Sequence, residues 1–286
     1  MSHQPVVKTQ KLTKKFGEFT ALNELSIELD RGRILGFIGP NGAGKTTTIK
    51  ILVGLARPTS GKAWIAGADC EQEAKQIKKL VGYMPDTFGA YENMRVREYL
   101  DFFGAAFGIP RKQRGPRIEE VLEVTNSTYM KDLYVQALSH GMKQRIGLTR
   151  TLLHDPEVLI LDEPANGLDP NARIEMREIL LRLADLGKTL IVTSHILPEL
   201  SRICDTVAII TEGNLRAFGT LDEIMKKISQ RRVIEMQLTG AGDVRQTAAM
   251  LEKALEAGTE ITPSEAEDTV RFTTSKDDEF LAKLLK

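Results

Sequence analysis

Residues 39 to 46 read Gly39-Pro40-Asn41-Gly42-Ala43-Gly44-Lys45-Thr46, and this octet has the spacing of a phosphate-binding loop. Gly42 and Gly44 allow a tight backbone turn that brings N–H groups against phosphate oxygens. Lys45 adds a positive charge beside them, and Thr46 offers a hydroxyl group to Mg²⁺. The octet therefore predicts that the protein uses ATP or GTP.

The segments on either side of the octet follow the order that such a loop requires. The apolar run Ile34-Leu35-Gly36-Phe37-Ile38 predicts a buried strand, and residues 46–53 predict a helix. That helix would aim its positive dipole end at the bound anion. We expect Asn41 and Thr47 to contact the nucleotide together with the loop residues named above. An ordinary glycine turn that happens to carry a lysine is the weaker interpretation, because strand, loop and helix occur in order.

The overall composition limits the kinds of partner. The chain has 286 residues, enough for one large domain with a small one appended, or for two domains. Lysine and arginine together number 39, and so do aspartate and glutamate, so the bulk charge does not favour a nucleic-acid partner. Cys70 and Cys204 are far apart, which excludes a disulfide framework and fits a reducing compartment.

No segment of the sequence predicts insertion into a membrane. No apolar run approaches the roughly 20 residues of a membrane span, and residues 1–15 are too polar for a signal peptide. If the protein works at a membrane, another chain has to supply the span. We therefore expect a cytoplasmic protein that is peripheral on the cytoplasmic face of the cell membrane through a partner.

The first domain is expected to cover residues 1–229 and to contain a mainly parallel sheet. Short β-like segments at 6–12 and 19–29 precede the loop and predict an antiparallel subdomain. Further on, strand-like runs alternate with helical patterns, which is typical of a parallel sheet covered on both sides. These alternating runs are 158–161 and 190–193, with earlier strand-like runs at 63–65 and 81–84. Between the alternating runs, a helix face that Gly187 ends is shared by Met176, Ile179, Leu180 and Leu183.

Residues 86–137 are expected to form a mostly helical insertion. It carries a stripe of apolar side chains, most of them aromatic, that recur at helical spacing. This aromatic stripe consists of Val96, Tyr99, Leu100, Phe103 and Phe107. Such a stripe is more often packing core than a ligand cage, so we interpret it as core.

The end of the chain predicts a second, smaller domain over residues 230–286. Residues 207–211 and 215–218 first predict a closing hairpin, followed by a helix over 221–228. Beyond the pair Arg231-Arg232, interpreted as a solvated boundary, short segments have the order strand, helix, strand, strand, helix, which suggests a ferredoxin-like α+β unit without its last strand. These segments are 233–238, 244–257, 260–263, 269–273 and 277–285.

Two carboxylates and a histidine supply candidate chemistry for hydrolysis. Asp162 and Glu163 directly follow the apolar run 158–161, the form of a strand whose carboxyl end delivers charge beside a nucleotide. Asp162 would hold Mg²⁺, and Glu163 would polarise the attacking water. His195 follows the strand predicted over 190–193, where it can contact the γ-phosphate or orient the water.

With these motifs in order, the chain resembles the ATP-binding subunit of an ABC transporter over roughly residues 6–220. The family's signature segment appears as Leu138-Ser139-His140-Gly141-Met142-Lys143-Gln144-Arg145. Its D-loop appears as Asn166-Gly167-Leu168-Asp169, and its switch histidine as His195. The resemblance implies a P-loop NTPase fold, with ATP and Mg²⁺ as cofactors.

The resemblance also implies a homodimer that encloses two nucleotides. In the family, the signature of one subunit closes over ATP held by the phosphate loop of the other, which assigns Ser139, His140 and Gly141 to the partner's nucleotide. For His140 the alternative is a side chain that is merely tolerated sterically at this position. A helix starting near Gly141, with Ser139 as its N-cap, would present a second anion-binding terminus. The family's adenine-stacking aromatic falls on Phe16, which we expect to stack on the base rather than to pack as a turn residue.

Two departures from the family pattern narrow the subfamily. The family's glutamine after the strand at 81–84 is here Asp86, a further candidate Mg²⁺ ligand, and its Leu-Ser-Gly-Gly-Gln is here Leu-Ser-His-Gly-Met. Both segments resemble ATPase subunits of exporters whose transmembrane permease is a separate polypeptide, a group in which a small C-terminal domain is also found. The helical insertion would then dock on cytoplasmic loops of that permease.

Three functions remain to be distinguished. The first is a transport ATPase whose nucleotide-driven dimer closure rearranges a membrane partner. The second is a soluble ABC ATPase acting on ribosomes or nucleic acid, which is disfavoured because a single set of motifs and no basic face are present. The third is a nucleotide-binding scaffold without turnover, which is disfavoured because Glu163 and His195 are both present.

Overall fold

The computed structural model describes residues 5–86, 89, 93–196, 200–229, 232–238, 244–255, 261–264 and 268–274. The chain divides into two compact units, Met1–Thr220 and Leu221–Lys286. The helix over 221–229 belongs to the second unit, whereas the sequence placed it with the first. Within the described ranges, no helix has the length and apolar character needed to cross a membrane.

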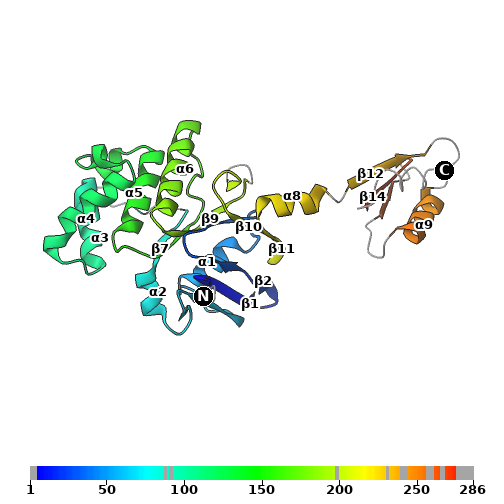
Figure 1. Ribbon diagram of the computed structural model, residues 1–286, viewed down its shortest axis with the longest axis horizontal. Helices are drawn as coiled ribbons and strands as arrows, with labels where there is room; N and C mark the ends of the chain where they lie inside the picture. The colour runs from blue at the N-terminus through cyan, green and yellow to red at the C-terminus, as the bar shows by residue number, and fades with distance from the viewer. Residues whose placement is uncertain are drawn as a thin grey trace. The chain divides into compact units, whose positions relative to one another are not determined.

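A six-stranded sheet of order β11-β10-β4-β9-β8-β7 is the centre of the first unit (Figure 1). All neighbouring pairs are parallel except β10 and β11, which form the expected hairpin. β4, β8 and β9 are buried along their whole length, as apolar strands covered on both faces should be. The bounds are β4 Ile34–Ile38, β7 Val81–Met84, β8 Val158–Leu161, β9 Thr189–Ser194, β10 Thr206–Thr211 and β11 Asn214–Gly219.

A second sheet is antiparallel, as expected for the segments before the phosphate loop. Its strands are β1 Val7–Phe16, β2 Phe19–Leu25, β3 Glu28–Leu29, β5 Ser60–Ile65 and β6 Ala68–Asp69. The prediction of a single strand over 19–29 is wrong, because the chain breaks between β2 and β3. Buried Thr9 explains the break: its hydroxyl donates to the Leu25 carbonyl at 3.0 Å and accepts from the Ile27 N–H at 3.0 Å, which replaces ladder hydrogen bonds there.

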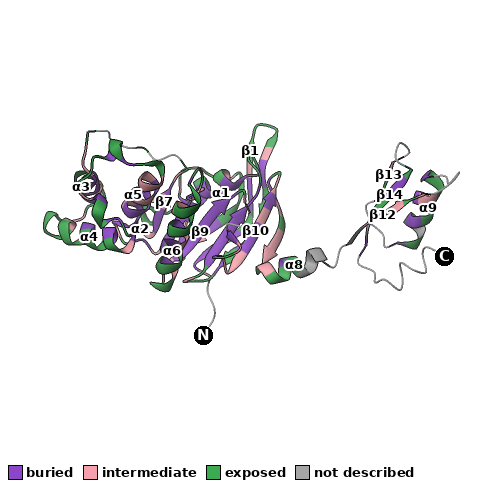
Figure 2. Ribbon diagram, turned by 90° about the horizontal axis from the view of Figure 1, so that it is seen from above, coloured by how far each residue is buried: buried purple, intermediate pink, exposed green. Residues whose placement is uncertain are grey.

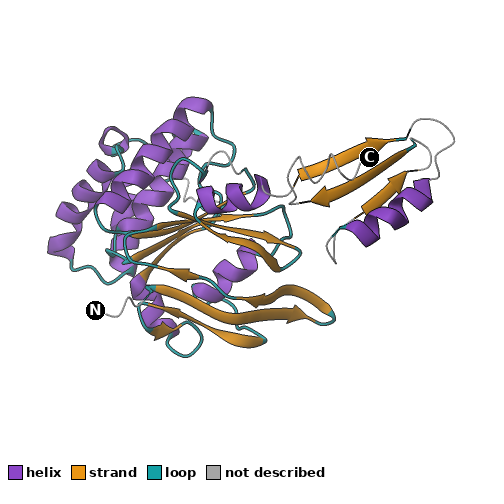
Figure 3. Ribbon diagram, turned by 45° about the vertical axis from the view of Figure 1, so that its right-hand side comes forward, coloured by secondary structure: helices purple, strands orange, loops and turns teal. Residues whose placement is uncertain are grey.

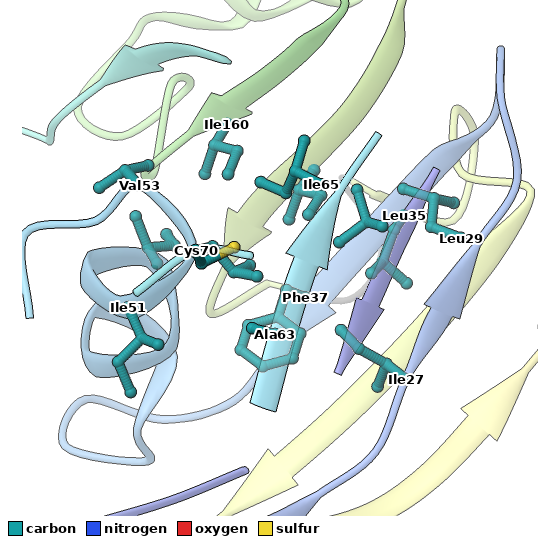
Figure 4. Close-up of a cluster of buried hydrophobic side chains, with 14 of the residues drawn as sticks. Ile27, Leu29, Leu35, Phe37, Ile51, Val53, Ala63, Ile65, Cys70 and Ile160 are labelled. Atoms are coloured by element: carbon teal, nitrogen blue, oxygen red, sulfur yellow. The ribbon is translucent and has the colours of Figure 1, made fainter. Parts of the chain in front are cut away.

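The main hydrophobic core lies between the two sheets and includes α1 (Lys45–Leu52). Figure 4 shows Leu35 and Phe37 of β4 facing Ala63 and Ile65 of β5, with Ile51 of α1 beside them. Because β4 and α1 are anchored in the same core, the loop that joins them is held at both ends. The core therefore fixes the position of the candidate phosphate site.

The remaining helices of this unit gather largely to one side of the layered strands (Figure 3). In the colouring by burial, the strand β9 is buried and β10 mixes buried with intermediate residues, while α3 and α4 expose much of their surface (Figure 2). The helices are α2 Ala74–Leu80, α3 Val96–Ala106, α4 Arg111–Val124, α5 His140–Leu152 and α6 Pro170–Asp185, with the short 3₁₀ turns η1 Thr128–Met130 and η2 Val135–Ala137. Gly187 follows α6 at φ 83°, the conformation that ends the helix as expected.

The aromatic stripe of α3 is only partly packing core. Val96, Tyr99 and Leu100 are fully buried, as predicted. Phe107 is 42% exposed and lines a groove together with Phe103, so the packing interpretation is wrong for this end of the stripe. Helical spacing identifies which face of a helix is apolar, but it does not show how far along that face other elements pack.

The second unit combines helices with a small sheet. It contains α8 Leu221–Ser229, β12 Arg232–Gln237, α9 Val244–Ala254, β13 Ile261–Ser264 and β14 Thr269–Thr274. The strands form an antiparallel sheet of order β12-β14-β13, and buried side chains of α9 pack with Val270 and Phe272 of β14. Arg231 and the helix predicted over 277–285 lie outside the described residues.

Candidate nucleotide-binding and hydrolysis site

The phosphate loop turns between β4 and α1 in a conformation that requires glycine. Gly42 and Gly44 have φ angles of 79° and 107°, a region that side chains with a Cβ rarely adopt. A Cβ on Gly44 would also lie 2.7 Å from the Ala21 carbonyl oxygen. The Gly213 N–H donates to the Ala43 carbonyl at 2.9 Å, which ties the loop to the β10–β11 turn.

The Lys45 side chain is buried and already partnered. Its Nζ donates to the Gly39 carbonyl at 2.6 Å and to the Pro40 carbonyl at 3.3 Å. The same ammonium lies 3.5 Å from Oε1 of Glu163. A bound phosphate must therefore compete with Glu163 for this charge.

Asp162 is a buried carboxylate held by two hydroxyl groups. Thr193 Oγ1 donates to its Oδ1 at 2.7 Å, and Thr46 Oγ1 donates to its Oδ2 at 3.2 Å. Burial raises the pKa of Asp162 above its ordinary value; both hydrogen bonds oppose the rise, and the negative charges of Asp86 and Glu163 add to it. The carboxylate thus lies where a cation would be stabilising.

Glu163 is set by an unusual backbone conformation. Its φ angle is 51°, which is costly for a residue with a side chain and is concentrated at functional sites. Its N–H donates to Thr193 Oγ1 at 2.8 Å, and its Oε2 lies 3.0 Å from Nδ1 of His195. Glu163 therefore lies between Lys45 on one side and His195, whose side chain is 44% exposed, on the other.

A pocket of about 320 Å³ opens over these groups. Its walls bring together most of the residues that the sequence singled out: Phe16, Asn41, Gly42, Gly44, Lys45, Thr46, Thr47, Asp86, Asp162 and Glu163. Phe19 also lines the pocket, which the sequence analysis did not predict. The signal that could have identified Phe19 is its position opposite Phe16 across the turn at Gly17. Both rings are largely exposed, so each offers a face on which a base can stack.

The signature residues Ser139, His140 and Gly141 do not line this pocket. Ser139 is the N-cap of α5, as predicted, and its Oγ accepts from the Met142 N–H at 3.3 Å. A Cβ on Gly141 would lie 3.2 Å from the Ala172 side chain, so a small residue is needed where α5 meets α6. The free N–H groups at the N-terminus of α5 therefore do not contact a phosphate that is held in this subunit's own pocket.

Thr193 is a residue that sequence reasoning missed. It is fully buried, and its hydroxyl group links the two candidate carboxylate residues.

Thr193→Val should lower the free energy of unfolding by about 2–3 kcal/mol, because a buried carboxylate and a backbone N–H lose their hydrogen-bond partner. Thr193→Ser keeps the hydroxyl and should recover most of the loss. Urea denaturation of the two variants checks this, and equal losses for both would contradict it.

Asp162→Asn should stabilise the nucleotide-free protein. A carboxyl group whose pKa is raised on folding destabilises the folded state at neutral pH, where it is ionised. An amide at this position removes that unfavourable contribution. The gain should be present at pH 7.5 and vanish as the pH falls below about 4, where both folded and unfolded chains of the unsubstituted protein are protonated at this position. Thermal melts across this pH range test the sign, and a lower melting temperature for Asp162→Asn at pH 7.5 would contradict it.

Comparison with known proteins is decisive for the family. Residues 22–166 match the ABC transporter family. The bacitracin transport ATP-binding protein BcrA of Bacillus licheniformis is 41% identical over 235 residues, which cover 82% of this chain and 75% of that protein. The chain belongs to the ABC transporter family. It is an ATP-binding subunit of α/β phosphate-loop fold whose reaction is ATP hydrolysis.

Further relatives agree with this assignment. The Nod factor export ATP-binding protein I of Ralstonia nicotianae is 35% identical over 90% of this ABC protein and 80% of its own length. The chain spans only 38% of the probable multidrug ABC transporter ATP-binding protein YbhF of Escherichia coli, at 35% identity. A solved ATP-binding subunit of an ABC transporter superposes with a TM-score of 0.70 at 29% identity, covering 78% of this chain and 93% of that one.

Proposed function

We propose that this protein is the ATPase subunit of an exporter, and that it hydrolyses MgATP as a head-to-tail homodimer to drive substrate through a separate transmembrane subunit. The observation that carries the proposal is the arrangement of Lys45, Asp162 and Glu163 around one pocket, while the signature lies outside that pocket. One subunit thus supplies only part of the protein contacts that each of the two bound nucleotides needs.

Mg²⁺ fits the oxygen donors of this pocket. Thr46 and Asp162 place a hydroxyl and a carboxylate 3.2 Å apart, and Asp86 lines the same wall. Mg²⁺ is usually held by one or two carboxylates together with substrate phosphates. The described residues contain no cluster of three or more His, Cys, Asp or Glu side chains that could hold a metal by themselves. When bound, the ion would neutralise charge on the phosphate oxygens.

Hydrolysis is assigned to Glu163 as general base. Its carboxylate takes a proton from water as the water oxygen attacks the γ-phosphorus, and the bond to the β–γ bridging oxygen breaks to leave ADP and phosphate. Lys45 moves from Glu163 to the phosphates when ATP binds. His195 Nδ1, 3.0 Å from Oε2, orients the carboxylate or donates to the γ-phosphate.

The second anion-binding terminus supports the proposed homodimer. α5 begins at His140 with Ser139 as its N-cap, so its first N–H groups and dipole favour an anion. An isologous pair of subunits supplies one ATP to each such terminus. Ser139, His140 and Gly141 are therefore assigned to the nucleotide of the other subunit.

We assign the membrane partner to a groove of about 800 Å³ between the central sheet and the helical insertion. Its lining residues include Lys75, Lys78 and Lys79, which carry positive charges, together with the half-buried ring of Phe103 and the exposed ring of Phe107. This combination fits an amphipathic segment of the permease with acidic and apolar side chains. The subunit would then lie on the cytoplasmic face of the cell membrane through that contact.

Export rests on the relatives. BcrA is named for bacitracin transport, another relative for Nod factor export, and LnrL of Bacillus subtilis for linearmycin resistance. These names support an exporter and give no support to the alternative of a soluble ATPase on ribosomes or nucleic acid.

Capture from membranes tests the proposal. Tagged Glu163→Gln protein, purified with MgATP from detergent-solubilised native membranes, should bring a polytopic membrane protein in stoichiometric amount. Soluble partners or ribosomes in its place would overturn the transport assignment while leaving the ATPase chemistry standing.

Phe107→Asp should separate docking from catalysis. The substitution places a negative charge in a basic, apolar groove, so recovery of the membrane subunit should fall at least about tenfold, within the range of hot-spot aromatics. ATP hydrolysis by the isolated subunit should not change. Leu186→Asp, at an exposed apolar residue that does not line the groove, is the matched control and should leave recovery unchanged. Equal recovery for both variants would contradict the docking site.

A further inference from the structure

Asn166 makes a hydrogen bond to each of three motifs. Its backbone N–H donates to the Glu163 carbonyl at 3.0 Å. Its side-chain Nδ2 donates to Oδ1 of Asp86 at 3.3 Å. Its carbonyl oxygen lies 3.0 Å from Nε2 of His140. The residue thus joins the general base, a wall of the phosphate pocket and the first residue of α5.

We propose that Asn166 is a positioning residue that sets the direction of the Asp86 carboxylate at the phosphate pocket according to the position of the α5 N-terminus, which it senses through His140. The proposal rests on the proposed ATP site and adds a physical link within one subunit. In the proposed homodimer the α5 terminus would face the other subunit's nucleotide, so the link would tell one pocket whether the other is occupied.

The contact between His140 and Asn166 depends on the imidazole side chain at position 140. A backbone carbonyl only accepts, so Nε2 of His140 carries the hydrogen and donates it. The ring also lies over Gly167, where a Cβ would be 3.3 Å from Nε2 and where φ is 68°. In the Leu-Ser-Gly-Gly-Gln pattern that this chain resembles, a glycine at the position of His140 offers no such donor.

The hydrogen bond from Asn166 fixes the direction of the Asp86 carboxylate. Asp86 lines the pocket together with Asp162 and Glu163, and like charges at short range repel one another. The Asn166 amide holds one oxygen of Asp86 in a fixed direction. Without that donor the exposed carboxylate is free to change rotamer, so the geometry around the γ-phosphate varies.

The contacts are suited to turnover rather than to folding. Asp86, His140 and Asn166 are all exposed in the single subunit, where a hydrogen bond competes with water and adds little stability. Removing the link should therefore change kcat while leaving the melting temperature, and the ATP affinity of the isolated subunit, nearly unchanged.

A charge swap tests the link directly. Asn166→Asp replaces the donor with an acceptor facing Asp86, and kcat for ATP should fall about tenfold with KM changed less than twofold, a coupling typical of residues in contact. In an Asp86→Asn background the amide at position 86 can donate to the carboxylate at position 166. There Asn166→Asp should change kcat less than twofold.

His140 provides the second arm of the test. His140→Ala should lower kcat several-fold, and His140→Gln, whose amide N–H reaches to a similar distance, should restore most of it. Asn126→Asp is the matched control, because Asn126 is an exposed asparagine that contacts Arg182 and no pocket residue. It should leave kcat and KM unchanged.

The outcomes distinguish the two proposals. If Asn166→Asp lowers kcat equally in both backgrounds, or in neither, the link is overturned and the ATPase assignment stands. If His140→Gln is as impaired as His140→Ala, the sensing arm is overturned. If the unsubstituted protein does not hydrolyse ATP at all, the proposed function and the link both fail.

Discussion

Glu163→Gln is expected to reduce kcat for ATP hydrolysis by about 10²–10⁴-fold, the contribution of a positioned general base. Glutamine keeps the shape of the side chain but cannot take the proton of the attacking water. ATP binding should become tighter, because Glu163 no longer competes with the phosphates for Lys45, 3.5 Å away. Phosphate release and calorimetric ATP binding, measured on the same preparation, check both effects.

The matched control for this variant is Glu178→Gln. Glu178 is an exposed carboxylate on α6 and does not line the pocket, so its loss should leave both quantities unchanged. Hydrolysis by Glu163→Gln within tenfold of the unsubstituted protein would contradict the assignment of the base.

Lys45→Ala is expected to weaken ATP binding by about 100-fold, within the 2–5 kcal/mol found when one partner of a buried charge pair is removed. The substitution leaves Asp86, Asp162 and Glu163 around the pocket without the ammonium that offsets them, so a polyanionic ligand meets net repulsion. Binding by isothermal titration calorimetry at one salt concentration measures the effect.

Lys50→Ala serves as the control because this exposed lysine lies on the same helix, α1, away from the pocket. Its ATP affinity should match that of the unsubstituted protein. A Lys45→Ala affinity within threefold of that value would show that the loop lysine does not carry phosphate binding.

The parts of the fold that the sequence predicted well are those with strong local signals. The strands over 81–84 and 158–161 have the predicted bounds because a short apolar run in a parallel sheet is buried on both faces. The N-cap at Ser139 and the helix end at Gly187 follow from local hydrogen bonding and from glycine's conformational freedom.

The errors have long-range causes. The break between β2 and β3 is made by Thr9, a residue 16 positions before its acceptor Leu25. The open end of the α3 stripe reflects which elements lie beside Phe103 and Phe107, and helical periodicity carries no such information.

The same division applies to the candidate site. The phosphate loop and the pair Asp162-Glu163 are contiguous motifs, so their residue types and order were sufficient to predict that they meet. Thr193 and Asn166 contribute through hydrogen bonds to residues 31 and 80 positions away, which only the folded chain brings near. Thr193 gave no separate signal, and Asn166 was identified only as part of the D-loop segment, without its hydrogen-bond partners.

The mass of Glu163→Gln protein in solution tests the account most directly. Light scattering after size exclusion should give a monomer without nucleotide and a dimer with MgATP, since ATP binds but is not consumed and each signature closes over the other subunit's phosphates. A protein that binds ATP to saturation and stays monomeric would contradict the head-to-tail site on which the proposed mechanism depends.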